Sequence, residues 1–286
     1  MEHFAPRVGI VTGGAHGIGR ALAAEVVARG GLAVLADRDD EGARTTAAEL
    51  TALGPGRAVA EHLDVADSAA VQALVEKVAA EHGRLDLMAN NAGILFSGPL
   101  EEFTDHHWST AIDVNLRGVV AGTRAAYAVM AQQESRRGRP AGVILNTGSL
   151  AGLIPAPRMA PYTSTKWAVV GFSQAVRHEA ASHGIQVNVL CPGYVDTKLI
   201  DEVFEPTASY VRGSFRRNTK ALQPRLLTPE VVARKAFSGI ERDKPVIIVG
   251  GFAHLSARAM GVAPAVVRAG SRLQAIREER QSRKGA

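Results

Sequence analysis

The first forty residues contain the feature that most restricts the fold: an apolar run, a glycine-rich turn and an alanine-rich helical stretch in direct succession. Val8 to Thr12 reads V-G-I-V-T, which is typical of a buried strand. It is followed by G-G-A-H-G-I-G and then by R-A-L-A-A-E-V-V-A-R-G, which closes at Gly30 and Gly31. Glycine lets the backbone approach a ligand closely, and free N–H groups at a helix start face negative charge. The unit therefore predicts a phosphate-binding turn between a strand and a helix.

Apolar runs go on alternating with helical patterns to about Thr197; the pattern is interrupted over 198–225, and one more helix and one more strand follow before residue 250. Alternation at this spacing gives right-handed crossovers and a parallel sheet covered by helices on both faces. The predicted fold class is therefore α/β with a doubly wound parallel sheet. The predicted strands are 8–12, 32–36, 58–63, 85–89, 143–146, 185–190 and 244–249, and the predicted helices are 40–53, 68–81, 104–130 (as one helix or two), 161–182 and one that starts at Thr228.

We predict one domain over residues 1–250, with a substrate loop at about 198–225, and a basic, alanine-rich helical extension over 251–286. Pro264 interrupts this extension, and its apolar part, between Arg258 and Arg268, is too short to span a bilayer. We expect it to pack on the body or on a partner subunit, with contact to a membrane surface as the less favoured alternative.

Charge and cysteine content limit the partners and the compartment. The single Cys191 rules out an internal disulfide and predicts a reducing, cytoplasmic setting, with the thiol as a small buried group. The first residues lack the pattern of a signal peptide. The net charge is +5, but from Arg212 onward 16 Lys and Arg face 5 Asp and Glu. Such a region can attract phosphates, acidic lipids or nucleic acid; we favour a solvated face and expect no nucleic-acid partner.

Three polar residues in the middle of the chain are candidates for catalysis. Tyr162 and Lys166 are four apart, so on a helix they share one face. A nearby ammonium is expected to lower the pKa of the phenol toward the range useful for acid–base catalysis, although such pairs also occur by chance. Ser149 follows the apolar run V-I-L-N-T-G and is expected at the carboxyl end of a strand, where α/β sheets bind ligands.

Asp37 stands at the end of the second predicted strand, 24 residues after Gly13. That spacing suits the carboxylate that accepts hydrogen bonds from an adenosine ribose, and the charge would repel a 2′-phosphate. NAD is therefore predicted over NADP. Arg38 keeps NADP open because a guanidinium can receive the phosphate, and Asp37 as a helix cap or turn residue is the alternative.

Taken together, these motifs resemble the short-chain dehydrogenase/reductase family, in its single-domain branch. The resemblance covers about residues 7 to 250. It rests on T-G-G-A-H-G-I-G (12–19), Asp37, Asp64-Val65, N-N-A-G (90–93), Asn115, Ser149, Y-T-S-T-K (162–166) and P-G-Y-V-D-T (192–197).

The resemblance implies a Rossmann-like sheet of about seven strands, with cofactor and substrate in one domain. It implies that Tyr162 is the general acid/base, that Lys166 tunes it and binds the nicotinamide ribose, that Ser149 binds the substrate oxygen, and that Asn115 holds a relay water. Asn115 as a packing amide and Ser149 as a turn residue are the alternatives. The implied cofactor-binding residues, beside Tyr162 and Lys166, are Gly13, His16, Gly17, Ile18, Gly19, Asp37, Arg38, Asp64, Val65, Asn91, Ala92, Gly93, Pro192, Gly193, Val195 and Thr197. His16 occupies a position that is sometimes basic in members that use NADP.

We therefore predict an NAD(P)-dependent oxidoreductase that interconverts a secondary alcohol and a ketone, with no metal site. Apolar residues suggest a steroid-, lipid- or terpene-like substrate held by Ser149, Leu153, Met159, Tyr194 and Phe204. A non-catalytic dinucleotide-binding sensor or scaffold with the same fold is the alternative. The resemblance further implies a homodimer or homotetramer formed through the long helices around Asn115 and Tyr162.

Overall fold

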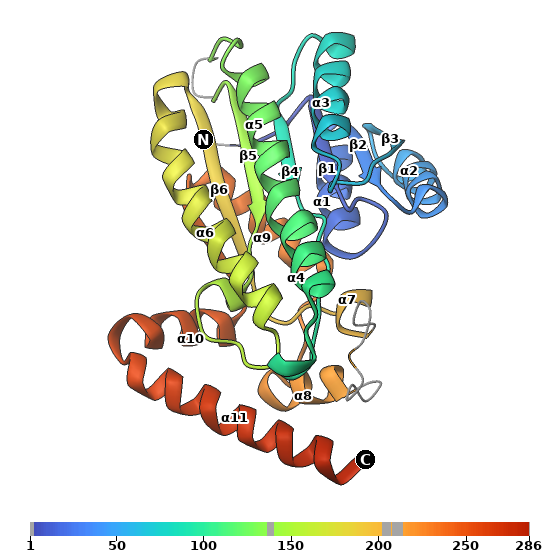
Figure 1. Ribbon diagram of the computed structural model, residues 1–286. Helices are drawn as coiled ribbons and strands as arrows, with labels where there is room; N and C mark the ends of the chain where they lie inside the picture. The colour runs from blue at the N-terminus through green and yellow to red at the C-terminus, as the bar shows by residue number, and fades with distance from the viewer. Residues whose placement is uncertain (1–2, 136–139, 202–206, 208–213, 286) are drawn as a thin grey trace.

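The computed structural model describes residues 3–135, 140–201, 207 and 214–285 (Figure 1). Within them, seven strands form one parallel sheet in the order β3-β2-β1-β4-β5-β6-β7. The predicted α/β class with a Rossmann-like parallel sheet is thereby confirmed. The strands are β1 (Val8–Thr12), β2 (Leu32–Asp37), β3 (Arg57–His62), β4 (Leu87–Asn90), β5 (Gly142–Thr147), β6 (Ile185–Pro192) and β7 (Val246–Val249).

Helices cover both faces of the sheet (Figure 1). Because successive strand residues point to opposite faces, Val11 and Leu35 join the core under one helix layer, whereas Ile10 and Val34 join the core under the other. The first layer holds α1 (Gly17–Ala28), α2 (Asp40–Leu53) and α9 (Pro229–Glu241); the second holds α3 (Ser68–His82), α4 (Asp105–Ile112), α5 (Gly118–Met130) and α6 (Ala160–Ala180).

Most element bounds agree with the sequence to within one or two residues, and the differences have local causes. The fourth strand starts at Leu87 instead of Leu85, because Leu85 bonds the side chain of Gln133 through its N–H and its C=O, whereas the backbone of Asp86 already bonds Val8 and Val143. The carboxylate of Asp86 accepts the N–H groups of Arg7 and Val8. These bonds fix the start of β4 against β1.

The stretch predicted as helical over 104–130 is two helices joined by a π turn, Asp113–Arg117. Single π turns inside helices occur frequently at functional sites, since they displace one side chain from the regular pattern. Here the π turn carries Asn115, which is fully buried.

Four short or terminal helices lie beyond the carboxyl ends of the strands, in the lower part of Figure 1. They are α7 (Lys198–Asp201), α8 (Ser214–Leu222), α10 (Gly251–Val262) and α11 (Pro264–Gly285). The break between α10 and α11 falls at Ala263, directly before Pro264, because proline cannot continue the hydrogen bonding of a preceding helix. No helix among the described residues is long and apolar enough to cross a membrane.

Candidate active site

A cavity of about 660 Å³ opens where the strands end. This is the position at which parallel α/β sheets bind their ligands. Most of the residues singled out in the sequence line it: Gly13, His16, Gly17, Ile18, Asp37, Arg38, Asp64, Val65, Asn91, Ala92, Gly93, Ser149, Met159, Tyr162, Lys166, Pro192, Gly193, Tyr194, Val195 and Thr197.

Three of the described candidates are not among its lining residues. Leu153 packs against the apolar cluster of Val169 and Val170 instead. Gly19 faces the glycine-rich turn, and Asn115 lies behind the cavity wall. Phe204, the remaining substrate candidate, lies outside the described residues.

The glycine-rich turn is held by close backbone contacts. A Cβ atom on Gly19 would lie 1.9 Å from the carbonyl oxygen of Gly13, so only glycine fits there. Gly17 has a φ of +53° and faces Thr197, to which an added Cβ would come within 3.0 Å. The Thr12 hydroxyl accepts the N–H groups of Asn91 and Ala92 at 2.9 and 3.1 Å. The turn therefore places its backbone directly against the cavity.

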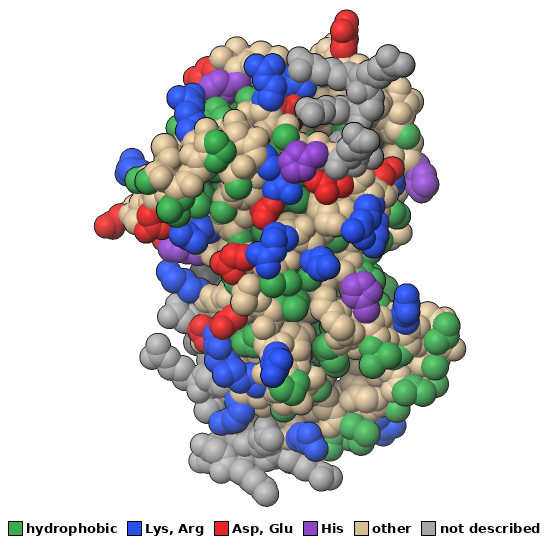
Figure 2. All heavy atoms as spheres, turned by 180° about the vertical axis from the view of Figure 1, so that it is seen from behind, with side chains coloured by type: hydrophobic (Ala, Val, Ile, Leu, Met, Phe, Trp, Pro, Cys, Tyr) green, Lys and Arg blue, Asp and Glu red, His purple; other side chains and the backbone are tan. Residues whose placement is uncertain are grey.

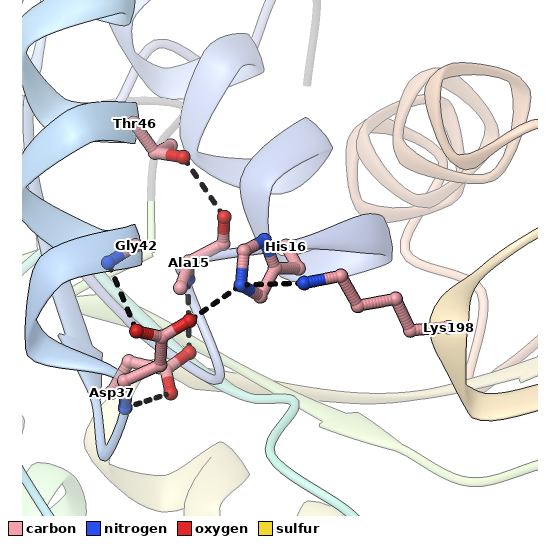
Figure 3. Close-up of polar contacts among 7 residues, drawn as sticks. Ala15, His16, Asp37, Gly42, Thr46 and Lys198 are labelled. Carbon is pink, nitrogen blue, oxygen red and sulfur yellow. Dashed lines mark hydrogen bonds and ion pairs between the residues drawn. The ribbon is translucent and has the colours of Figure 1, made fainter. Parts of the chain in front are cut away.

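Asp37 ties this turn to the start of α2 (Figure 3). One carboxylate oxygen accepts the N–H of Ala15 at 2.9 Å, and the other accepts the N–H of Asp39 at 3.0 Å. Thr46 of α2 donates its hydroxyl to the Ala15 carbonyl at 2.8 Å. The cap of α2 is Asp39, which accepts the Gly42 N–H, so Asp37 does not have the cap role that was one alternative for it. Its bond from the Asp39 N–H, two residues on, is that of a turn residue, the other alternative.

His16 lies between a carboxylate and an ammonium group (Figure 3). Its Nε2 atom is 2.6 Å from Oδ2 of Asp39 and 3.3 Å from Nζ of Lys198. The hydrogen bond from Gly42, and then the one with His16, lowers the pKa of Asp39. Lys198 is the first residue of α7, so this contact joins the glycine-rich turn to the start of the segment predicted as a substrate loop.

Ser149 and Tyr162 meet at the other end of the cavity. Ser149 caps the short 3₁₀ helix Leu150–Gly152 by accepting the Ala151 N–H at 3.1 Å, and its hydroxyl interacts with the phenol of Tyr162 near the start of α6. Lys166, one turn further along α6, donates its ammonium to the carbonyl oxygen of Thr147 at 2.8 Å. Its Nζ lies 5.5 Å from the centre of the Tyr162 ring, and the whole side chain is only 2% exposed.

Burial shifts the pKa of Tyr162 in the direction opposite to the one predicted from the sequence. Desolvation raises the pKa of Tyr162, although the Ser149 hydrogen bond opposes it. The same loss of water lowers the pKa of Lys166 to about 8, because burial disfavours the charged ammonium. Lys166 is not among the causes of the shift in the Tyr162 pKa, so the lowering expected from it is absent and desolvation sets the direction.

Two buried groups support this arrangement from behind. Cys191 is a free, buried thiol, and burial raises its pKa to about 12, so it stays protonated as a small packing group. Asn115 pairs with the backbone of Ile94 through two bonds of 2.9 Å, one donated and one accepted. A Cβ atom on Gly93 would lie 3.1 Å from the Asn115 oxygen and 3.6 Å from the Lys166 nitrogen, so these two polar atoms flank Gly93.

This geometry can be compared with known proteins. The family model described as short chain dehydrogenase matches residues 7–208. The chain belongs to the short-chain dehydrogenase/reductase family. It is therefore an oxidoreductase that acts on carbonyl and hydroxyl groups. Members of the family bind NAD(P) and act on small molecules.

Relatives from bacteria agree with this assignment. A Streptomyces virginiae protein named as the ketoacyl reductase of monensin polyketide synthase is 36% identical over 240 residues, 82% of this chain and 89% of the relative. The 3-oxoacyl-[acyl-carrier-protein] reductase FabG of Escherichia coli is 35% identical over 198 residues, 69% of this chain and 77% of the relative. The oxidoreductase EphD of Mycobacterium tuberculosis is 33% identical over 278 residues, which are 96% of this chain but only 46% of EphD.

The solved structures include a short-chain dehydrogenase/reductase from Burkholderia phymatum in complex with NAD. It superposes with a TM-score of 0.81 at 28% identity, over 93% of this chain and 96% of that one. The motifs of this short-chain dehydrogenase/reductase thus lie in a fold seen elsewhere with a bound dinucleotide.

Sequence reasoning missed part of the cavity wall. Lys198 was not singled out, although a cation directly after P-G-Y-V-D-T and opposite a phosphate-binding turn is a signal that could have identified it. Ile154 and Ala156 belong to a loop without a regular pattern, so nothing local indicated that they face the cavity. The other missed lining residues are Leu63, Ile94, Leu95, Val114, Thr147, Gly148, Leu150 and Ala151.

Proposed function

We propose that the protein interconverts a secondary alcohol and a ketone on an apolar substrate, with Tyr162 as general acid/base and NAD as the preferred cofactor. The observation that carries the proposal is that Ser149 and Tyr162, whose hydroxyl groups interact, lie in the wall of the cavity that the glycine-rich turn and Asp37 also line. One cavity thus contains both a proton donor and the features that suit a dinucleotide.

The residues present fit a nicotinamide dinucleotide. The glycine-rich turn offers a backbone cradle that side chains would fill, and Asp37 lies at the end of β2 where an adenosine ribose would bind. Asp64 and Val65 would flank the adenine, Lys166 would hold the nicotinamide ribose, and the segment 192–197 would face the nicotinamide. The bound cofactor supplies or accepts the hydride.

The protein's own residues would place the substrate and move its proton. In ketone reduction the Tyr162 phenol donates its proton to the carbonyl oxygen, and the Ser149 hydroxyl donates a hydrogen bond to the same oxygen. The raised pKa of Tyr162 keeps the phenol protonated at neutral pH, which is the form that reduction requires. Lys166, beside Asn115, is the route through which the proton of Tyr162 would be replaced.

The NAD preference rests on charge. The Asp37 carboxylate would repel a 2′-phosphate and accept hydrogen bonds from ribose hydroxyls. Arg38 and His16 line the same end of the cavity, but His16 already contacts the carboxylate of Asp39 at 2.6 Å. Because this contact already occupies Nε2 of His16, that nitrogen is less available to bind a 2′-phosphate, which supports the preference for NAD over NADP.

An apolar substrate is supported by the side chains at the other end of the cavity. They are aliphatic and aromatic, and include Leu95, Leu150, Ile154, Met159, Tyr194, Leu199, Ile200 and Phe215. Relatives named as ketoacyl reductases favour a ketone on an acyl chain within the broader steroid-, lipid- or terpene-like class. We further propose a homo-oligomer formed through α5 and α6, where Trp167 is 44% exposed, and a cytoplasmic setting for the unpaired Cys191.

Replacement of Tyr162 by phenylalanine tests the catalytic proposal. Tyr162→Phe removes the proton donor and preserves the ring, so kcat should fall by about 10³-fold while the Kd for NADH changes less than about twofold. Turnover is followed by NADH absorbance with a panel of apolar ketones, and Kd by NADH fluorescence. Tyr127→Phe is the matched control, because Tyr127 on α5 contacts His183 and is not among the cavity's lining residues.

Retention of near-normal turnover by Tyr162→Phe would refute the assignment. Firm NADH binding by the unmodified protein, with no hydride transfer over a broad panel of alcohols and ketones, would instead favour the dinucleotide sensor.

A further inference from the structure

The last helix, α11, places its polar side toward the body of the protein. Ser271 donates its hydroxyl to the carbonyl oxygen of Pro155 at 3.0 Å. One heptad further on, the Glu278 carboxylate lies 4.0 Å from the guanidinium of Arg158, and both side chains are less than 20% exposed. Gln274, between them on the same face, donates to Glu278 at 3.0 Å. These polar contacts fix the orientation of the helix.

The opposite side of α11 carries large apolar side chains that are exposed. Val266, Leu273 and Ile276 are 68%, 67% and 38% exposed, and Ala269 completes a stripe with spacings of three and four residues. A helix that packs alone on a soluble domain turns its apolar stripe inward, so the orientation here is reversed. Leu255 and Val262 on α10 add exposed fractions of 71% and 86%.

We define the terminal patch as Leu255, Val262, Val266, Leu273 and Ile276. Figure 2 shows apolar side chains gathered over the lower right of the molecule, where α10 and the first turns of α11 lie in that view. Scattered exposed apolar residues are normal, but a continuous group on one end of a protein marks a surface that binds something.

The charge around this patch is strongly positive. After Gly250 the sequence has seven Lys and Arg against two Asp and Glu, whereas residues 1–250 carry 26 of each, so the net charge of +5 resides in the extension. Arg258, Arg268, Arg272 and Arg277 are all exposed on α10 and α11. One of the two acidic residues, Glu278, faces Arg158 on the body and leaves the outer side of the helix basic.

The exposed apolar side chains and the surrounding arginines together indicate what binds this surface. A second copy of the patch would bring arginines against arginines, which opposes self-association. A bilayer with anionic lipids complements both properties, since its headgroups attract arginine and its acyl region accepts exposed leucine and valine side chains. We propose that α10 and α11 bind the protein to the surface of an anionic lipid bilayer through the terminal patch and its arginines.

The location of the patch connects it with the cavity. The loop that receives α11 through Pro155 and Arg158 also contributes Ile154, Ala156 and Met159 to the cavity wall. Tyr194, another lining residue, stacks on Phe252 of α10 with ring centres 6.2 Å apart. Docking would therefore bring the substrate end of the cavity near the lipid. This last step rests on the proposed apolar substrate; the surface binding does not.

Vesicle co-sedimentation tests the binding without substrate or cofactor, so its result is independent of the proposed reaction. The full chain should sediment with phosphatidylglycerol-containing vesicles, bind pure phosphatidylcholine vesicles at least about tenfold more weakly, and dissociate at high salt. The variant Arg268→Gln/Arg272→Gln/Arg277→Gln should lose at least about tenfold in affinity. Val266→Gln/Leu273→Gln should lose a similar factor, because glutamine preserves helix propensity and removes the apolar contact.

Leu53→Gln is the matched control, since Leu53 at the end of α2 is 80% exposed and lies outside the patch. It should bind vesicles like the unmodified chain, and all variants should retain the circular dichroism of a folded protein. Equal binding to both lipids, no binding at all, or full binding by Val266→Gln/Leu273→Gln, the patch variant, would overturn the proposal. A smaller sedimentation coefficient for the patch variant in the absence of lipid would assign the patch to a second copy instead.

Discussion

The two ends of the cavity are built in different ways. At the nucleotide end, backbone lies against backbone: a Cβ atom on Gly19 would meet the Gly13 carbonyl at 1.9 Å, and the added Cβ of Gly13 would lie 2.9 Å from Cα of Ala92. At the substrate end, short helices are held by side chains near the surface. Arg216 of α8 binds Asp196 and Asp201, whose side chains are 55% and 46% exposed.

This contrast indicates which part of the cavity can change its ligand specificity with little loss of stability. A phosphate-binding turn recognises its ligand through N–H groups and close approach, so few side-chain changes are tolerated there. Exposed ion pairs contribute little to stability, so residues beside them can vary without unfolding the protein. The substrate end can therefore be altered to suit different ketones while the nucleotide end stays fixed.

The largest effect is expected from adding one methyl group to the nucleotide end. Gly19→Ala would force its Cβ against the Gly13 carbonyl, so the turn must shift and the free energy of unfolding should fall by about 3 kcal/mol. The Kd for NADH should rise at least about tenfold, because the displaced carbonyl belongs to the turn that we propose binds the pyrophosphate. Urea unfolding and NADH fluorescence measure the two changes.

Gly171→Ala adds the same methyl group to the middle of α6, where nothing lies within 4 Å of the new Cβ. It should stabilise the protein by up to about 1 kcal/mol, because alanine is the better helix former. If Gly19→Ala proved as harmless as this control, the nucleotide end would not be the rigid half.

The nucleotide end was also the more predictable from sequence. Gly13, Gly17 and Asp37 can be identified from the sequence, because the turn needs particular backbone angles and contacts that few residue types satisfy. The caps Asp67 and Thr228 were predictable for the same reason, since each side chain accepts an N–H of the helix that it starts. Local chemistry fixes these positions, so a local pattern reveals them.

The substrate end depends on contacts between distant segments, which no local pattern encodes. Arg158 and Glu278 are 120 positions apart, and nothing around either residue predicts that they meet. The pKa of Tyr162 shows the same limit: the Lys166 spacing was evident, but the burial that decides the direction of the shift depends on the whole fold. The side of α11 that faces the body likewise required the structure.

A smaller effect is expected at Asp37, the proposed ribose site. Asp37→Asn retains an acceptor oxygen but removes the charge, so the ratio of the NADPH and NADH Kd values should fall about tenfold, mainly through tighter NADPH binding. Fluorescence titration with both cofactors measures the ratio. Asp67→Asn is the control, because this exposed cap of α3 loses the same charge outside the cavity and asparagine still caps a helix. An unchanged ratio in Asp37→Asn would place the discrimination on another residue.

The smallest effect on stability is expected at the substrate end. Arg216→Gln breaks the pairs that join α8 to Asp196 and Asp201, yet these pairs are solvent-exposed, so the free energy of unfolding should change by less than about 1 kcal/mol. Because α7 and α8 bring Ile200 and Phe215 to the cavity, their loosening should raise KM for an apolar ketone about three- to tenfold and leave the Kd for NADH unchanged. Arg217→Gln, the exposed neighbour on α8, is the control and should alter neither value. A rise in the NADH Kd that matched the rise in KM would mean that α8 also supports the nucleotide, and the division of the cavity into a rigid and an adaptable half would fail.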